Sequence, residues 1–251
     1  MSGKPAVMIV TGGSGAIGAA IALAAAGAGY AVVVNFKSNT AAAAQVVDTI
    51  RASGGSAMAV QADVAHQPDV RRLFRATIDE FGAPTVLVNN AGLIGAVRPI
   101  EEADETFLNS LFAANITSAF LCAGEAARAM SRRHGGAGGS IVNITSAAAR
   151  HGGMIGEAHY AASKGAIDVF TVALAKELGA AGIRVNAIRP GLIESPIHEI
   201  HGGHDAIAKL ADSVPLKRTG TAREVADVLL WLVSERASYV HGAIIDVTGG
   251  R

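Results

Sequence analysis

Two side chains on one expected helix have the spacing that proton transfer requires. Tyr160 and Lys164 are four residues apart, so a helix places them on one face, one turn from each other. A phenol has an unperturbed pKa near ~10, and a neighbouring ammonium favours the phenolate. The pair therefore predicts a tyrosine that acts as acid or base closer to neutral pH. Taken alone, the same spacing is typical of an ordinary surface pair, so the assignment needs companions elsewhere in the chain.

A glycine-rich segment near the N-terminus has the composition of a phosphate-binding turn. Residues 11–18 are Thr-Gly-Gly-Ser-Gly-Ala-Ile-Gly, and they follow the apolar run Ala6–Val10 directly. A helix N-terminus attracts anions through its unpaired N–H groups and its dipole, and glycine permits close backbone approach. A tight strand-to-helix connection alone would also explain the glycines. The position at the first such junction favours nucleotide binding, with contacts expected from Gly12, Ser14, Gly15, Ala16, Ile17 and Gly18.

Short apolar runs alternate with stretches of helical spacing along the whole chain. The expected strands are Ala6–Val10, Ala31–Asn35, Ala57–Gln61, Val86–Asn89, Ile141–Ile144, Ile183–Ile188 and Ala243–Val247. The expected helices are Ala16–Ala28, Thr40–Ala52, Pro68–Phe81, Thr106–Arg133, Tyr160–Ala180 and Ala222–Val233, the last with a capping box of Thr221 and Glu224. The strands are apolar nearly throughout, which is typical of burial on both faces. The pattern predicts an α/β fold: one doubly wound Rossmann domain over residues 1–251, with a parallel sheet of about seven strands and helices on both faces.

Composition and charge exclude several classes of protein. Half of the residues are hydrophobic, so the chain is not intrinsically disordered. Lys plus Arg and Asp plus Glu both number 21, so nothing indicates nucleic acid or a membrane as a partner. The uncharged stretch Thr11–Phe36 is too rich in Gly and Ala to predict a membrane span, and we expect no signal peptide. Cys122 is the only cysteine, which fits a reducing, cytoplasmic location.

Further motifs follow in a fixed order and complete a recognisable set. Asn89-Asn90-Ala91-Gly92 closes one expected strand, Asn115 lies in a helical stretch, Ser146 follows another strand, and Arg189-Pro190-Gly191 follows a third. With the glycine-rich turn and the Tyr160–Lys164 pair, they make the chain resemble the short-chain dehydrogenase/reductase family from Ala6 to Gly250. The combination is highly specific.

The resemblance implies a role for each catalytic residue. Tyr160 is expected to donate a proton to a carbonyl oxygen in the reduction direction. Lys164 is expected to lower the pKa of Tyr160 and to bind the nicotinamide ribose. Ser146 would orient the substrate oxygen, and Asn115 would hold a water that links Lys164 to solvent.

The resemblance also implies the remaining contacts with a nicotinamide cofactor. Asp63 and Val64 would meet the adenine, and Asn90, Ala91 and Gly92 would line the adenosine side. The nicotinamide and its carboxamide would be held by Pro190, Gly191, Ile193 and Ser195. Tyr160 and Lys164 would also contact the cofactor. The family's chemistry requires no metal ion.

Two departures from the family pattern bear on the site. Ala16 replaces the second glycine of the usual turn, which a negative φ would tolerate. Ser146 precedes Tyr160 by one residue more than is common, and shifting to Thr145 would lengthen the gap further. An extra residue within the loop Arg150–His159 is the simpler explanation.

The end of the second expected strand bears on the choice of cofactor. An acidic side chain there accepts hydrogen bonds from the ribose of NAD and repels a 2′-phosphate. Phe36 stands where that acid would be, and Asn35, Lys37 and Ser38 are candidates to meet the phosphate. Lys37 is also compatible with an ordinary solvated loop lysine. The missing acid favours NADP over NAD.

The segment Ile193–Pro215 is expected to be a substrate loop, because long excursions between a strand and a helix are usually functional. His198, His201 and His204 lie in it, but the intervening glycines make a helical metal cluster a minority interpretation. We therefore predict no metal site.

The expected function is an NADP(H)-dependent oxidoreductase that interconverts a carbonyl and a secondary alcohol. The alternative is a catalytically silent, nucleotide-sensing protein on the same fold, but such proteins generally lose the Tyr-x-x-x-Lys pair that this chain keeps. A lyase or epimerase would usually carry a longer C-terminal region. The small-molecule substrate stays open, with 3-oxoacyl compounds, sugars and other carbonyls all possible. By resemblance we expect a homotetramer, with a dimer as the second choice.

Overall fold

The computed structural model describes residues 5–194 and 210–251, and within them it forms a seven-stranded sheet. The strands are β1 (Val7–Val10), β2 (Ala31–Phe36), β3 (Ala57–Gln61), β4 (Val86–Asn89), β5 (Gly139–Ile144), β6 (Ile183–Pro190) and β7 (Ile244–Val247). The helices are α1 (Ala16–Gly27), α2 (Thr40–Ala52), α3 (Gln67–Phe81), α4 (Glu105–Phe112), α5 (Ser118–Met130), α6 (Ala148–His151), α7 (Ala158–Leu178) and α9 (Ala222–Val233).

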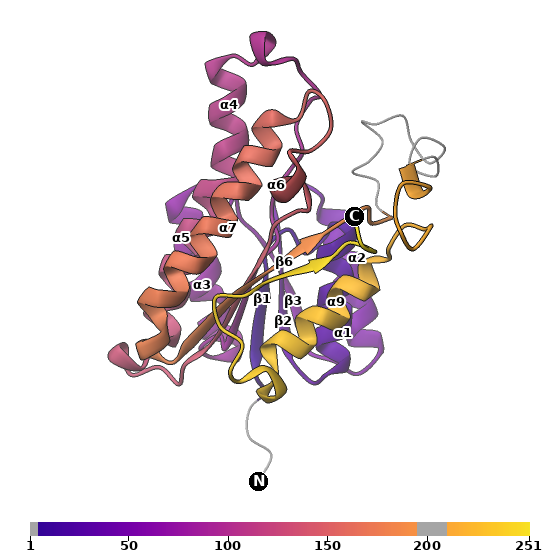
Figure 1. The fold of residues 1–251 in the computed structure, drawn as a ribbon. Coiled ribbons are helices and arrows are strands. Elements are labelled where there is room, and N and C mark those ends of the chain that lie inside the picture. The colour runs from indigo at the N-terminus through magenta and orange to yellow at the C-terminus, as the bar shows by residue number, and fades with distance from the viewer. Residues whose placement is uncertain (1–4, 195–209) are drawn as a thin grey trace.

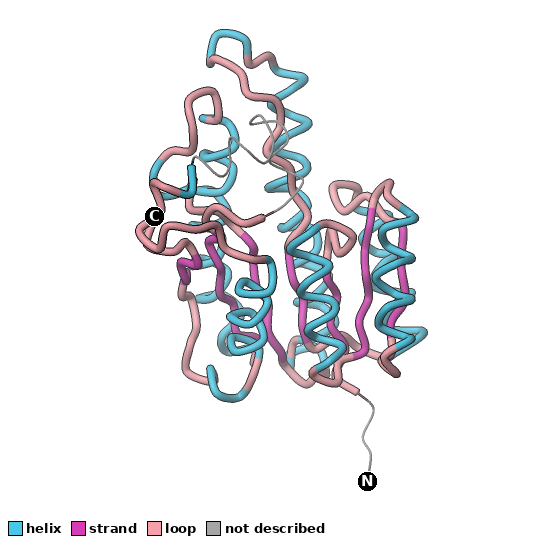
Figure 2. Tube along the Cα trace, turned by 90° about the vertical axis from the view of Figure 1, so that its right-hand side faces the viewer, coloured by secondary structure: helices cyan, strands magenta, loops and turns pink. Residues whose placement is uncertain are grey.

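The sheet is parallel throughout and has the order β3-β2-β1-β4-β5-β6-β7. Helices α1, α2 and α9 cover one face, and α3, α5 and α7 cover the other (Figures 1 and 2). Strands β1, β2 and β4 are buried at every position, which explains why they are apolar throughout. The predicted doubly wound α/β fold is confirmed.

The order of the strands creates one natural binding crevice. The chain moves from β1 outward to β3, then returns to place β4 on the other side of β1. Loops that leave the carboxyl ends of β1 and β4 therefore diverge, and ligands of such sheets bind in the gap between them. Helix α4 and the first turns of α7 rise beyond this edge of the sheet (Figure 1).

The helix predicted over Thr106–Arg133 is interrupted in the structure. Residues Ala113–Thr117 form a π-turn between α4 and α5, and Asn115 lies in it, buried. A π-turn adds a residue to the helical repeat and is found mostly at functional sites. The predicted capping box of Thr221 and Glu224 is confirmed, and it forms at the start of α9.

By length and composition, the segment Glu105–Met130 is the one described helix that could cross a membrane. Its apolar character has a simpler cause, since Cys122, Ala126 and Met130 pack into the core between the helices and the sheet. Helices that line the core of an α/β fold are often as long and as apolar as helices that span a membrane.

The packing of α9 on the sheet generates a stability prediction. Leu229 is fully buried in α9, so Leu229→Ala should leave a cavity and lower the free energy of unfolding by roughly 2–5 kcal/mol. Leu23 of α1 is 40% exposed, and Leu23→Ala should cost less than about 1 kcal/mol. Urea unfolding followed by circular dichroism measures both. Equal losses in the two variants would contradict the assigned packing.

Candidate active site

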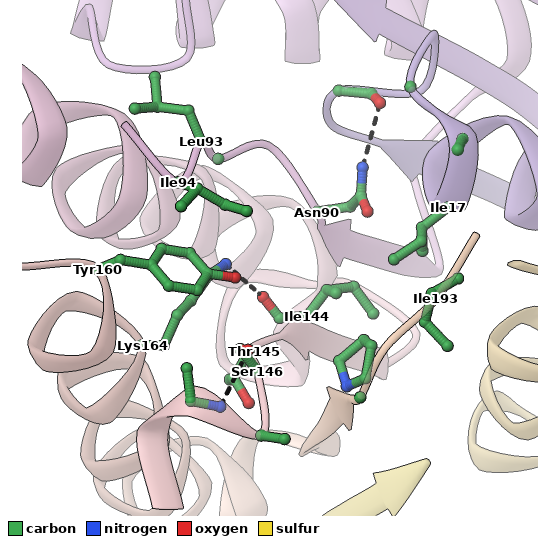
Figure 3. A pocket seen from close by; sticks show the side chains of 18 of the residues that line it. Ile17, Asn90, Leu93, Ile94, Ile144, Thr145, Ser146, Tyr160, Lys164 and Ile193 are labelled. Carbon is green, nitrogen blue, oxygen red and sulfur yellow. Dashed lines mark hydrogen bonds between the residues drawn. The ribbon is translucent and has the colours of Figure 1, made fainter. Parts of the chain in front are cut away.

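A cavity of about 450 Å³ opens at the carboxyl ends of the central strands, the size of a small-molecule site. Figure 3 shows Tyr160, Lys164 and Ser146 on one side of it and Asn90 and Ile17 on another. Of the predicted residues, those lining the cavity are Gly12, Ser14, Gly15, Ala16, Ile17, Gly18, Asn90, Ala91, Gly92, Ser146, Tyr160, Lys164, Pro190, Gly191 and Ile193. Outside the lining are Asn35, Phe36, Lys37, Ser38, Asp63, Val64 and Asn115. Ser195 and the three loop histidines lie outside the described residues.

The glycine-rich turn requires glycine at two positions. Gly12 has a φ of +60°, in the left-handed region. A Cβ on Gly18 would stand 2.4 Å from the carbonyl oxygen of Gly12, so no larger residue fits there. Ala16 is the first residue of α1, and Gly15 before it has an extended backbone with a φ of −82°. The methyl group of Ala16 is therefore tolerated, in agreement with the expectation of a negative φ.

Three polar side chains hold this turn in place. The amide of Asn90 donates to the carbonyl oxygens of Thr11 (2.9 Å) and Gly12 (3.1 Å). The Thr11 hydroxyl accepts hydrogen bonds from the backbone N–H groups of Asn90 and Ala91. From β2, the buried Asn35 accepts from the N–H of Gly12 at 3.3 Å. Protein contacts alone therefore fix the turn.

The start of α1 fits a phosphate group. Its N-cap residue, Gly15, has no side chain to satisfy the first N–H groups, and the first turn contains no acidic residue. These N–H groups and the helix dipole face the cavity wall formed by Ser14 and Ala16. The residues present therefore match the pyrophosphate of a dinucleotide cofactor.

The structure brings Ser146, and not Thr145, to the phenol of Tyr160. Ser146 and Tyr160 line one cavity and Ser146 lowers the pKa of the phenol, whereas the buried hydroxyl of Thr145 donates to the carbonyl of Ile188 on β6. Burial raises the pKa of Tyr160, Ser146 acts in the opposite direction, and the charge of Glu157 adds to the rise.

The lowering of the Tyr160 pKa expected from Lys164 does not outweigh burial in this structure, because the pKa of the phenol is raised overall. The ammonium of Lys164 lies 5.9 Å from the centre of the Tyr160 ring and donates to the carbonyl of Ile144 at 3.0 Å. Lys164 is itself buried, which lowers its pKa to about 8 although the charge of Asp168 opposes this.

Asn115 uses its side chain to fix the loop beside the phenol. Its Oδ1 accepts from the N–H of Leu93 and its Nδ2 donates to the carbonyl of Leu93, both at 2.8 Å. The same Nδ2 donates to the hydroxyl of Ser163, which in turn donates to the backbone carbonyl of Tyr160. The side chain of Asn115 is therefore fully engaged in protein contacts.

The end of β2 corrects two predictions. The ring of Phe36 is 6% exposed and packs in the core, so it does not stand beside a ribose. The amide of Asn35 is buried and donates to the carbonyls of Val60 and Ala62, so it cannot reach a 2′-phosphate. Sequence placed both residues at the right strand end but could not show which way their side chains point.

Lys37 and Asp63 form an ion pair instead of acting separately. Their side chains are 2.7 Å apart, and that of Lys37 is 72% exposed. Burial alone would raise the pKa of Asp63, but the hydrogen bonds from Lys37 and Ala65 hold it below its usual value. The carboxylate that was expected to meet the adenine is thus engaged with the lysine expected to meet the phosphate.

Other cavity residues were missed by the sequence analysis. Asn39 lines the cavity and caps α2, its Oδ1 accepting from the N–H of Ala42, and its place before a helical stretch was a usable signal. Glu157 is buried, lines the cavity and raises the pKa of Tyr160, and no sequence pattern marked it. Within the described ranges, no three His, Cys, Asp or Glu side chains gather as metal ligands.

Comparisons with known proteins agree with this geometry. The sequence model of the enoyl-(acyl carrier protein) reductase family matches residues 12–251. The uncharacterized oxidoreductase YgfF of Escherichia coli is 42% identical over 247 residues, covering 98% of this chain and 100% of the relative. A 3-oxoacyl-[acyl-carrier-protein] reductase of Synechocystis is 38% identical over 245 residues, covering 97% and 96%.

Solved structures show the same architecture. A short-chain dehydrogenase/reductase from Serratia marcescens has a TM-score of 0.90 at 31% identity, covering 98% of this chain and 97% of that one. A blue fluorescent protein from a metagenomic library, solved in complex with NADPH, has a TM-score of 0.89 at 32% identity with the same coverage. The chain therefore belongs to the short-chain dehydrogenase/reductase family, oxidoreductases that bind a nicotinamide cofactor.

Proposed function

We propose that this protein is an NADPH-dependent reductase that converts a carbonyl to a secondary alcohol, with Tyr160 as the proton donor. The observation that carries the proposal is that Ser146 and Tyr160 share one cavity with the phosphate-binding turn, with Ser146 close enough to lower the pKa of the phenol. A hydride acceptor bound against this pair would also lie within reach of a dinucleotide held by that turn. We propose that the chain works as one Rossmann-type domain.

The pKa of Tyr160 supports the direction of reduction. Because burial raises this pKa, the phenol stays protonated at neutral pH and is suited to donate to a carbonyl oxygen that gains electrons. Ser146 would orient that oxygen through a second hydrogen bond. When bound, the nicotinamide cofactor supplies the hydride. Lys164 would hold the cofactor's ribose, and its ammonium would stabilise the phenolate left after proton transfer.

The choice of NADP over NAD rests on the end of β2 and the start of α2. The described structure places no carboxylate of β2 at this edge, while Lys37, Ser38 and the capping Asn39 lie next to the start of α2. A 2′-phosphate at the start of α2 would interact with the helix dipole, the side-chain amide of Asn39 and the exposed ammonium of Lys37. One similar structure was solved with NADPH. NAD is the less favoured cofactor.

The substrate is best sought among compounds with a reducible carbonyl next to an apolar group. Leu93, Ile94, Met154 and Leu192 line the cavity near the catalytic pair. Several relatives are named 3-oxoacyl-[acyl-carrier-protein] reductases, which makes a 3-oxoacyl thioester the first substrate to test.

A first prediction concerns the phenol. Tyr160→Phe removes the proton donor and should lower kcat for NADPH-dependent reduction of acetoacetyl-CoA by about 10²–10⁴-fold. The affinity for NADPH should stay nearly unchanged, since the phosphate-binding turn is fixed by residues other than Tyr160. Stopped-flow absorbance and calorimetry measure the two quantities.

Matched variants separate the catalytic hydroxyl from its neighbour. Ser146→Ala should also lose most activity, whereas Thr145→Val should mainly lose about 1 kcal/mol of stability with the Ile188 hydrogen bond. A Tyr160→Phe protein that keeps most of kcat would remove Tyr160 from the mechanism. NADPH binding without turnover of any carbonyl by the native protein would favour the catalytically silent alternative.

A second prediction concerns cofactor choice. Asn39→Asp keeps an N-cap for α2 but places a carboxylate on the cavity wall where a 2′-phosphate would lie. It should weaken NADPH binding by about ten- to a hundred-fold, because one hydrogen bond to a charged group contributes that much to affinity. The affinity for NADH should change little. Fluorescence titration with each cofactor measures both affinities.

Asn39→Ser is the control, because it keeps the cap without adding charge. It should retain the preference for NADPH. Tighter binding of NADH than NADPH by the native protein would contradict the assignment, and Lys37 would then be an ordinary surface lysine paired with Asp63.

We propose a homotetramer, with a dimer as the alternative, in a reducing cytoplasmic setting that suits the buried free thiol of Cys122. Two apolar side chains on one helical layer support self-association: Phe120 of α5 is 50% exposed and Val169 of α7 is 71% exposed. Phe120 stacks on Phe170 at 3.8 Å between ring centres, so the apolar surface is continuous across both helices.

This surface generates a third prediction. Light scattering should give a mass near four times 25.3 kDa, and Val169→Glu should lower it because a charge would be buried between subunits. Arg223→Glu, on the exposed side of α9, serves as the control and should leave the mass unchanged. A native mass of one chain would contradict self-association.

A further inference from the structure

A buried carboxylate lies one turn beyond the catalytic lysine on α7. Asp168 is 7% exposed and follows Lys164 by four residues, so both side chains emerge on the same buried face of the helix. The Oδ2 of Asp168 accepts two hydrogen bonds from Arg189, at 2.9 and 2.7 Å. Its Oδ1 is buried without a hydrogen-bond partner in the described structure. One carboxylate thus pairs with Arg189 and lies one helical turn from Lys164.

The two cations are attached to neighbouring strand ends. Lys164 donates to the carbonyl of Ile144, the last residue of β5, and Arg189 lies near the end of β6. These strands pair with Ile144 beside Ile188. Arg189 also precedes Pro190, which lines the cavity. Asp168 therefore connects the helix that carries the catalytic pair to the end of β6, where Pro190 lines the cavity.

We propose that Asp168 is a positioning residue that keeps the Lys164 ammonium charged and held against β5 for catalysis. The proposal rests on the proposed function, in which a charged Lys164 supports proton transfer by Tyr160. An ammonium that loses water on burial needs a counter-charge, and the amide oxygen of Ile144 carries only a partial one. Asp168, one turn away on the same buried face, supplies that counter-charge, and its Oδ1 is not used by Arg189.

The other charged groups near Lys164 do not replace Asp168. On α7 and its N-cap, Tyr160 is neutral at pH 7 and Glu157 acts on the phenol. From β6, Arg189 adds a positive charge, and from β7, Asp246 reaches Arg189 at 3.6 Å and Arg150 of α6 at 3.0 Å. Next to Arg150, His151 of α6 is exposed. The π-turn contributes the neutral Asn115.

The test measures the charge of Lys164 directly and does not depend on activity. Native protein and variants are labelled with ¹³C at the lysine Cε, and Lys164→Arg identifies the Lys164 signal among the six lysines. Native Lys164 should titrate at about pH 8. Asp168→Asn removes the anion and should lower this midpoint by about one unit or more, since loss of a nearby opposite charge disfavours the ammonium.

Two variants serve as controls. Asp246→Asn removes a carboxylate that contacts Arg189 but lies beyond it, and it should leave the midpoint of Lys164 in place. Asp168→Glu restores the charge and should return the midpoint toward the native value. If Asp168→Asn does not fold, Asp168→Leu combined with Arg189→Met replaces the buried pair by apolar side chains. The midpoint should again fall, but by less than in Asp168→Asn, because the positive charge of Arg189 is removed together with the anion.

Activity gives the second readout. In the reduction of acetoacetyl-CoA by NADPH, the alkaline limb of kcat/KM should move to lower pH in Asp168→Asn, by the same amount as the titration midpoint. An unchanged Lys164 midpoint in folded Asp168→Asn would overturn the proposal, even if stability falls. A native protein without reductase activity but with a shifted midpoint would instead contradict the proposed function alone.

Discussion

The site depends on one constraint: α7 must bury a polar face against the ends of β5 and β6. That face carries Tyr160, Ser163, Lys164 and Asp168. Ser163 donates to the helix backbone, Lys164 donates to the end of β5, and Asp168 accepts from Arg189. Water is largely excluded there, so charges interact strongly and unpaired groups are costly. The same burial raises the pKa of Tyr160 and lowers that of Lys164. Fold stability and proton chemistry are therefore set by one packing arrangement.

A second polar arrangement fixes the opposite wall of the cavity. Thr11, Asn35 and Asn90 hold the glycine-rich turn through hydrogen bonds from three different strand ends. Because these partners all belong to the protein, the N–H groups at the start of α1 are held toward the cavity by the fold itself. The sheet order brings both walls together, since the loops that leave β1 and β4 diverge at the crevice and β5 and β6 lie beside β4 under α7.

Sequence alone could give the elements and the chemistry but not the direction of side chains. Strand β3 (Ala57–Gln61) and helix α9 (Ala222–Val233) match their expected bounds because apolar runs and a capping box are local signals. The side chains of Asn35 and Phe36 are both buried, Asn35 by its hydrogen bond to the segment after β3 and Phe36 by packing against the helices. Both contacts join segments that are distant in the sequence. The pairing of Lys37 with Asp63 and the burial of Glu157 join distant segments, so no spacing rule reveals them. The π-turn at Asn115 likewise has no sequence signal, because a single inserted residue leaves the apolar pattern of α4 and α5 nearly intact.

The central claim is that Tyr160 is a neutral proton donor, kept protonated by burial beside Ser146. The most direct measurement is an ultraviolet difference titration of the native protein against Tyr160→Phe, which isolates the tyrosinate absorbance of this one phenol. The account predicts that Tyr160 ionises above the ordinary pKa of tyrosine. Ionisation below that value, in the absence of cofactor, would show that Lys164 and not burial controls the phenol, and would contradict the account.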